Sequence, residues 1–455
     1  MRPDTVLINV IPGETRIALL ARGQAIEFLF DRADAGSVEG AVFAGRVTKV
    51  NKDLNAAFID IGTGVPGFLA AADARRRPEE RIKSIADVMS EGDRVLVQAD
   101  REAMDGKGAR LTCRLALAGR YLTLLTGGDG LEFSRALAAS ERQRLDALDE
   151  MLPAGLGVAF HPAAGGAALD VLQADLTALV DRLDGMDSDF EAVKKAPALL
   201  MPAPGAVSRA LALAAPNARV VTDDAALAAD LGAEGWNGPQ PLFEAFGAEA
   251  ALEAALDPVV PLPSGGRMIV SETPALTAID VDTGAARGDG AAQRLAAQTN
   301  REAVKALGRE LRLRNLSGQI LIDFLAMKGK KDRHEILSLL RGAISADPVE
   351  GHILGYTALG LVEMTRRRRG PSLAALLTQP GGRVPSAETA ALAALRQALA
   401  TRGPVIVLTC APQVADLLSG DLREACRQVN ERLGGALKVT AEAALGPSGF
   451  EISAG

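Results

Sequence analysis

Three aspartates interrupt two apolar stretches in the second half of the sequence. Asp280 and Asp282 stand in the run AIDVDTG, and Asp323 ends the run GQILID. Side chains two residues apart in a strand project to the same face, and an ionised carboxylate on a buried strand needs a cation or several hydrogen-bond donors. Oxygen ligands suit Mg²⁺, which is commonly held by one or two carboxylates. The alternative for each aspartate is a structural role, in which it caps the turn after its strand.

Aromatic and basic residues that suit a polyanion lie in the first quarter of the chain. Phe58 and Phe68 fall in two short strand-like runs, AAFID and PGFLA, and Lys107 lies in a glycine-rich turn. Exposed aromatic rings stack on bases, and lysine contacts phosphate. The alternative is that both phenylalanines belong to a core, which is the more common position of phenylalanine in a strand.

The overall charge limits how a polyanion could be bound. The chain has 455 residues and a formal net charge of −7, which argues against binding of nucleic acid by bulk electrostatics. Contacts must therefore be local. The basic run Arg366–Arg369 is unbroken, and we expect Arg366 and Arg367 to contact phosphate, the alternative being a solvated strand end.

The cysteines and the N-terminus bear on the compartment. Cys113, Cys410 and Cys426 are far apart in the sequence and form no CxxC pair, which argues against a disulfide framework and a local zinc site. The N-terminus lacks the apolar core of a signal peptide, and no apolar run reaches the roughly 18 residues of a membrane span. We therefore expect a cytoplasmic protein with no membrane span.

The elements that must position these residues predict several domains. At about 100–200 residues per domain, the chain should hold two to four. Five short strands with glycine-rich turns, between residues 41 and 117, predict a small barrel. Further along, the pattern predicts a hairpin over 267–282, a long amphipathic helix over 290–313 and a buried strand over 318–327. A compact α/β unit is expected from residue 388 onward.

Together these segments resemble the bacterial ribonuclease E/G family across almost the whole chain. The stretches that carry the resemblance are VFAGRVTKVNKDLNAAFIDIG, LPSGGRMIV, ALTAIDVDTG, LRLRNLSGQILIDF and GLVEMTRRRRGPSL. Asp280 and Asp323 are 43 residues apart, which is similar to the spacing in that family. No single stretch is specific, but the combination is.

The resemblance implies an α/β multidomain fold. An S1 (OB-type) β-barrel is inserted in an RNase H-like subdomain and is followed by a 5′-sensor-like region, a DNase I-like catalytic subdomain and a small α/β C-terminal domain. The expected boundaries are 1–37 and 196–257 for the RNase H-like subdomain, 38–119 for the S1 domain, 120–195 for the 5′-sensor-like region, 258–375 for the catalytic subdomain, 376–387 for a linker and 388–455 for the C-terminal domain.

The resemblance also implies an activity. It is Mg²⁺-dependent endonucleolytic cleavage of single-stranded, often AU-rich RNA, leaving a 5′-phosphate, in rRNA processing or mRNA decay. Asp280 and Asp323 match the family's metal-binding and catalytic carboxylates. Asp282 stands where better-known members carry asparagine, and its extra charge would tighten the binding of Mg²⁺ or favour Mn²⁺.

The same resemblance assigns RNA contacts and reveals two departures. Phe58, Phe68 and Lys107 fall at the S1 positions that contact RNA, which favours their exposure. After the motif GPSL no cysteine follows, so no zinc link is expected, and any homodimer would form without zinc. His161 and Pro162 replace the family's Arg-Thr pair. Histidine binds phosphate poorly near neutral pH because it lacks the two parallel N–H donors of arginine, and proline has no donor. This difference argues against sensing of a 5′-monophosphate.

Two competing functions remain open. The chain could be an RNA-binding protein of the same ancestry with weak or no nuclease activity, a hypothesis that the altered sensor and the missing zinc link motivate. The retained aspartates favour catalysis, because a pure binder has no evident need for two carboxylates facing RNA. A metal-dependent DNA nuclease is the third hypothesis, and the S1-like segment disfavours it.

Overall fold

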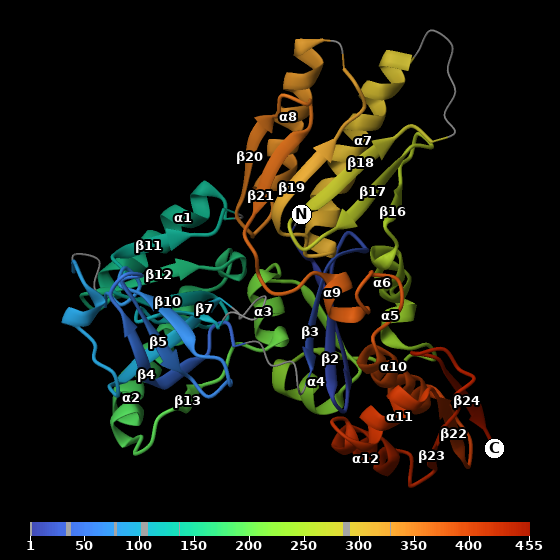
Figure 1. Ribbon diagram of the computed structural model, residues 1–455, viewed down its shortest axis with the longest axis horizontal. Coiled ribbons are helices and arrows are strands. Elements are labelled where there is room, and N and C mark those ends of the chain that lie inside the picture. Colours follow the sequence, from blue (N-terminus) through green and yellow to red (C-terminus); the bar gives the residue numbers. More distant parts are fainter. Residues whose placement is uncertain are drawn as a thin grey trace. The chain divides into compact units, whose positions relative to one another are not determined.

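The computed structural model describes residues 2–32, 38–76, 80–101, 108–135, 137–284, 292–327 and 329–455. The chain divides into two compact units. One combines residues 3–35 with residues 219–455, and the other consists of residues 36–218 together with Arg2. Figure 1 shows the elements of both units.

The first unit begins with a five-stranded sheet built from both ends of its split sequence. Its order is β15-β14-β1-β2-β3, with β14 parallel to β1, so the chain leaves this sheet after β3 and returns to it at β14. The strands are β1 (Thr5–Ile11), β2 (Glu14–Ala21), β3 (Gln24–Arg32), β14 (Arg219–Thr222) and β15 (Glu234–Gly235), and the helices that follow are α4 (Ala225–Leu231), α5 (Leu242–Ala245) and α6 (Ala248–Leu256). The second unit is thus an insertion between β3 and β14.

The second unit opens with a closed barrel of five strands. The strands pair in the order β4-β5-β6-β8-β7, and β7 closes the ring on β4, while β13 adds to β4 from outside. They are β4 (Val42–Asn51), β5 (Ala56–Asp60), β6 (Gly67–Ala70), β7 (Arg94–Arg101), β8 (Arg110–Thr112) and β13 (Ala198–Met201), with a 3-10 turn η1 (Ile85–Asp87). Gly45 lies where the pairing of β4 changes from β7 to β5. A Cβ at this position would lie 2.5 Å from Ile59 Cγ2, so only glycine fits here. The barrel confirms the prediction from the strand and turn pattern.

A second sheet of the same unit packs against a long helix. Its order is β11-β12-β10-β9. The elements are β9 (Ala116–Ala118), β10 (Leu122–Thr126), β11 (Gly130–Phe133), α1 (Ala139–Leu145), η2 (Asp146–Met151), β12 (Leu156–Phe160), η3 (Pro162–Ala164), α2 (Leu169–Ala192) and α3 (Ala206–Leu213). Leu172, Leu176 and Leu179 of α2 recur at helical spacing and are buried in the core of this region.

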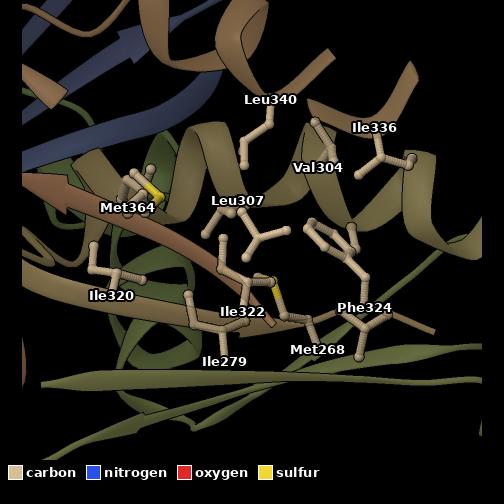
Figure 2. Close-up of a cluster of buried hydrophobic side chains, with 14 of the residues drawn as sticks. Met268, Ile279, Val304, Leu307, Ile320, Ile322, Phe324, Ile336, Leu340 and Met364 are labelled. Atoms are coloured by element: carbon tan, nitrogen blue, oxygen red, sulfur yellow. The ribbon is translucent and has the colours of Figure 1, made fainter. Parts of the chain in front are cut away.

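A six-stranded sheet with one helix-covered face forms a further part of the first unit. Its order is β16-β17-β18-β19-β21-β20. The elements are β16 (Val259–Pro261), β17 (Arg267–Glu272), β18 (Thr277–Asp282), α7 (Ala292–Leu313), β19 (Gly318–Asp323), α8 (Lys330–Ser345), β20 (Gly351–Tyr356) and β21 (Val362–Arg366). Figure 2 shows how Ile279, Ile320 and Ile322 of the strands meet side chains of α7 and α8, such as Leu307 and Leu340, in one core.

The last residues form a small α/β layer with a three-stranded sheet of order β23-β22-β24. Its elements are α10 (Ala387–Ala400), β22 (Ile406–Cys410), α11 (Pro412–Ser419), α12 (Arg423–Arg432), β23 (Leu437–Ala441) and β24 (Phe450–Ala454), whereas the preceding α9 (Leu373–Leu377) packs into the core of the first sheet. Buried Glu14 of β2 accepts hydrogen bonds from Arg32 at 2.8 Å and from Arg396 of α10. Burial lowers the pKa of Arg396 to about 10. This charge network joins α10 to the first sheet.

The α/β multidomain class predicted from the sequence is confirmed. In the part of the chain that the structure describes, no helix combines the length and the apolar character that crossing a membrane requires.

Candidate functional site

Asp280 and Asp323 lie side by side on the open face of the six-stranded sheet. They are in-register partners on the parallel strands β18 and β19, and both side chains are exposed. Their neighbours Ile279 and Ile322 point the other way, into the core beneath α7 and α8. Within the described ranges, neither carboxylate has a hydrogen bond or an ion pair with another residue. The two charges therefore face each other with no protein cation between them.

Helix α7 fixes the chain on either side of these aspartates. The fully buried amide of Asn300 donates to the Leu325 carbonyl at 2.9 Å and accepts from the Leu325 N–H at 3.0 Å, which holds the segment just after Asp323. Glu302 accepts from the Ser264 N–H at 2.8 Å, which holds the turn before β17. Sequence reasoning missed Asn300, although its place one turn before Val304 on the apolar stripe of α7 was a signal.

The aspartate pair fits a divalent cation. Like charges directly opposite each other on neighbouring strands are unfavourable, and a bound cation would remove this repulsion. Among the residues that the structure describes, no group of three or more histidine, cysteine, aspartate or glutamate side chains is arranged to hold a metal. Two carboxylates suit Mg²⁺, because that ion retains waters and takes further oxygens from substrate phosphates.

Asp282, which the sequence predicts as a third metal ligand, is paired with an arginine. Its Oδ2 accepts from Arg267 Nη2 at 2.7 Å and from Nε at 3.0 Å, and its Oδ1 accepts from the Gly284 N–H at 3.0 Å. The Gly284 N–H and the Arg267 guanidinium lower the pKa of Asp282. The carboxylate is therefore ionised, with its charge balanced by Arg267.

Arg366 lies in the interior, so the prediction that it contacts RNA is wrong. Only 5% of this residue is exposed, and its guanidinium donates to Asp347 at 2.8 Å and to the Leu316 carbonyl at 2.9 Å. Arg367 is exposed, and its contact with phosphate stays a prediction. Arg366 pairs with Gly318, the first residue of β19, whereas Asp323 is the last residue of that strand. The arginine run therefore begins five residues from Asp323 along β19, or about 16 Å at 3.3 Å per residue.

On the barrel, Phe58 and Phe68 are paired on the outer surface. They are cross-strand neighbours on β5 and β6, half-buried, with ring centroids 5.8 Å apart and an interplanar angle of 73°. Lys107 lies outside the described residues. The pairing instead places exposed Lys49 next to Phe58 and exposed Arg110 next to Phe68. The Arg110 guanidinium also donates to Asp73 Oδ2, at 2.8 Å from Nη2 and 3.1 Å from Nε. Sequence reasoning missed these two basic residues because they become neighbours of the rings only through strand register.

His161 follows β12, with both ring nitrogens occupied. Nδ1 lies 3.2 Å from the Arg120 carbonyl, which can only accept, so this nitrogen carries the proton. Nε2 lies 2.7 Å from the Thr123 hydroxyl. Pro162 is buried in the turn that follows. Neither residue thus offers a donor for a terminal phosphate in this arrangement.

Comparison with known proteins decides the family. A profile described as the Ribonuclease E/G family matches residues 116–369, which include both aspartates of the site. The chain belongs to the ribonuclease E/G family. Ribonuclease G of Haemophilus influenzae is 31% identical, with 98% of each chain aligned, and ribonuclease G of Escherichia coli K12 is 29% identical over 98% of this chain and 99% of its own. Ribonuclease E of a Nostoc species is 33% identical over 73% of this chain and 52% of its own.

A second profile bears on the barrel of this ribonuclease E/G family member. The S1 RNA binding domain matches residues 38–114, which contain β4 to β8. The S1 match indicates RNA binding. The resemblance drawn from the sequence motifs is confirmed.

The different settings of Arg366 and Arg367 predict different defects. Arg366→Ala leaves the Asp347 carboxylate buried without its partner and should lower the free energy of unfolding by about 3–5 kcal/mol, measured by urea denaturation. Arg367→Ala, the matched exposed variant, should leave that free energy unchanged. An Arg366→Ala protein as stable as the parent would contradict the buried ion pair.

Proposed function

We propose that this protein cleaves single-stranded RNA at internal phosphodiester bonds, with Mg²⁺ held by Asp280 and Asp323. Membership of the ribonuclease E/G family makes it an endoribonuclease, a hydrolase, as the sequence motifs predict. The observation that carries the finer proposal is the in-register aspartate pair without a protein partner within the described ranges. A cation bound at this aspartate pair would balance its negative charge, and the open face of the sheet leaves room for a polyanion.

The chemistry follows from this donor set. Bound Mg²⁺ would supply an activated water and offset charge on the phosphate that is attacked. The sheet holds the two carboxylates at fixed separation, and the core beneath them keeps β18 and β19 in register. Cleavage of the bond between phosphorus and the 3′ oxygen leaves a 5′-phosphate on the downstream product. Mn²⁺, which also accepts carboxylate oxygens, is the natural substitute in a test.

In this proposal the outer surface of the barrel binds the RNA. Phe58 and Phe68 present half-buried rings on which successive bases would stack, at roughly 1–3 kcal/mol per base. Lys49 and Arg110 would contact the backbone on either side. Stacking is tolerant of sequence, so this surface favours unpaired RNA, and AU-rich segments are the least structured. RNA processing or decay in the cytoplasm is the setting that we propose, without a zinc link between subunits.

The first test removes one carboxylate at a time. Asp280→Asn and Asp323→Asn should each lower the Mg²⁺-dependent cleavage rate of a single-stranded AU-rich oligonucleotide at least about 100-fold, since each removes a direct ligand. Glu335→Gln changes an exposed carboxylate between α7 and α8 and serves as the control that keeps full activity. Full activity in either aspartate variant would refute the site. Binding without cleavage by the parent protein would favour the alternative of an RNA-binding protein.

The second test concerns the 5′ end of the substrate. Because His161 is bonded to Thr123 and Arg120 and Pro162 is buried, we expect equal cleavage rates for one RNA carrying either a 5′-monophosphate or a 5′-hydroxyl. Single-turnover rates of the two forms measure this directly. A preference of tenfold or more for the 5′-monophosphate would show that another part of this region recognises the phosphate.

A further inference from the structure

An arginine shares the open face with the two aspartates. Arg267 of β17 and Asp282 of β18 are directly opposite each other in register, and Arg267 Nε and Nη2 both donate to the same oxygen, Asp282 Oδ2. The other oxygen of Asp282 accepts the Gly284 N–H. The guanidinium is thus held by a carboxylate that is itself fixed to the backbone.

The position of this pair relates it to the proposed metal site. Asp282 lies two residues after Asp280 on β18, so both project to the same face, with their Cα atoms about 6.6 Å apart along the strand. In the Arg267–Asp282 pair, 49% of the arginine side chain and 36% of the aspartate side chain are exposed. Within the described residues, no hydrogen bond to Arg267 Nη1 is found, so this nitrogen has two N–H donors for a ligand.

We propose that Arg267 binds a backbone phosphate of the RNA, next to the phosphate at the Asp280–Asp323 site, and that Asp282 positions the guanidinium for this contact. The inference rests on the proposed function, because it assumes that RNA occupies the open face. Arg267 would donate to the phosphate next to the scissile bond. This contact would set on which side of the metal site the RNA strand lies.

The chemistry of the pair favours a phosphate over a second metal. An arginine beside Asp282 repels a cation but attracts an anion, and its planar fork matches the oxygens of phosphate. A side chain held in place loses less rotamer freedom on binding than an unrestrained arginine. Without Arg267, the Asp282 carboxylate would add its unbalanced negative charge to that of Asp280 and Asp323 on the same face.

The chain provides a matched control pair on the other side of the same sheet. Arg301 of α7 donates to Glu335 of α8 through Nε at 2.8 Å and Nη2 at 3.1 Å, and their side chains are 47% and 41% exposed. The chemistry and exposure match those of Arg267 and Asp282. This pair, however, belongs to the helices that cover the face opposite to the aspartates.

The experiment measures binding of a non-cleavable oligonucleotide with Mg²⁺ present, so that catalysis does not enter while the charge of the Asp280–Asp323 pair can be balanced. Affinity of the parent, Arg267→Gln and Arg301→Gln for this single-stranded oligonucleotide is measured at a fixed Mg²⁺ concentration over a series of monovalent salt concentrations. Loss of one phosphate contact should reduce the slope of log affinity against log salt by about 0.7 in Arg267→Gln. Arg301→Gln should keep the parent slope. An unchanged slope in Arg267→Gln overturns the proposal.

The positioning role of Asp282 has its own readout. In an Asp282→Asn background, Arg267→Gln should weaken RNA binding less than it does in the parent, because the unanchored arginine binds less well from the start. Equal effects in both backgrounds would overturn that role. If the parent protein cleaves RNA but Arg267→Gln binds it normally, the inference about Arg267 is overturned and the proposed function stands. If the parent neither binds nor cleaves RNA, the proposed function fails first.

Discussion

The repulsion between Asp280 and Asp323 is the constraint on which the site depends. The parallel pairing of β18 with β19 sets two exposed carboxylates directly opposite each other, and no described side chain neutralises them. Like charges at this position destabilise a sheet, so the arrangement costs free energy unless a cation binds. The hydrophobic core below, shown in Figure 2, offsets that cost by fixing the register of both strands. A bound divalent cation turns the unfavourable pair into a binding site.

The surrounding structure places the remaining charges so that RNA can approach an acidic protein. Arg267 neutralises Asp282, and Asn300 of α7 holds the backbone after Asp323 without adding a charge to the face. On the barrel, Lys49 and Arg110 flank the two phenylalanine rings. The formal net charge of −7 is therefore a poor guide to binding, because the groups that would meet RNA are few and local.

Sequence patterns predicted the structure where residue type and strand periodicity indicate the same element. The strand-and-turn pattern predicted the barrel, and the apolar strands with their interrupting aspartates predicted two aspartates on adjacent strands. The pattern could not predict pairing across strands that are distant in sequence, which is what joins Arg267 to Asp282 and brings Arg110 beside Phe68. Nor could it reveal burial: Arg366 belongs to a run of four arginines, yet an ion pair with Asp347 holds it inside.

The most direct measurement of the central claim is the binding of a divalent cation itself, in the absence of RNA. Titration of the intact protein with Mn²⁺, followed by electron paramagnetic resonance of the free ion, counts the bound ions. The parent should bind one ion that the Asp280→Asn, Asp323→Asn double variant does not bind, while Glu335→Gln should behave as the parent. Equal binding by the parent and the double variant would contradict the account, because the ion would then be held elsewhere in the chain.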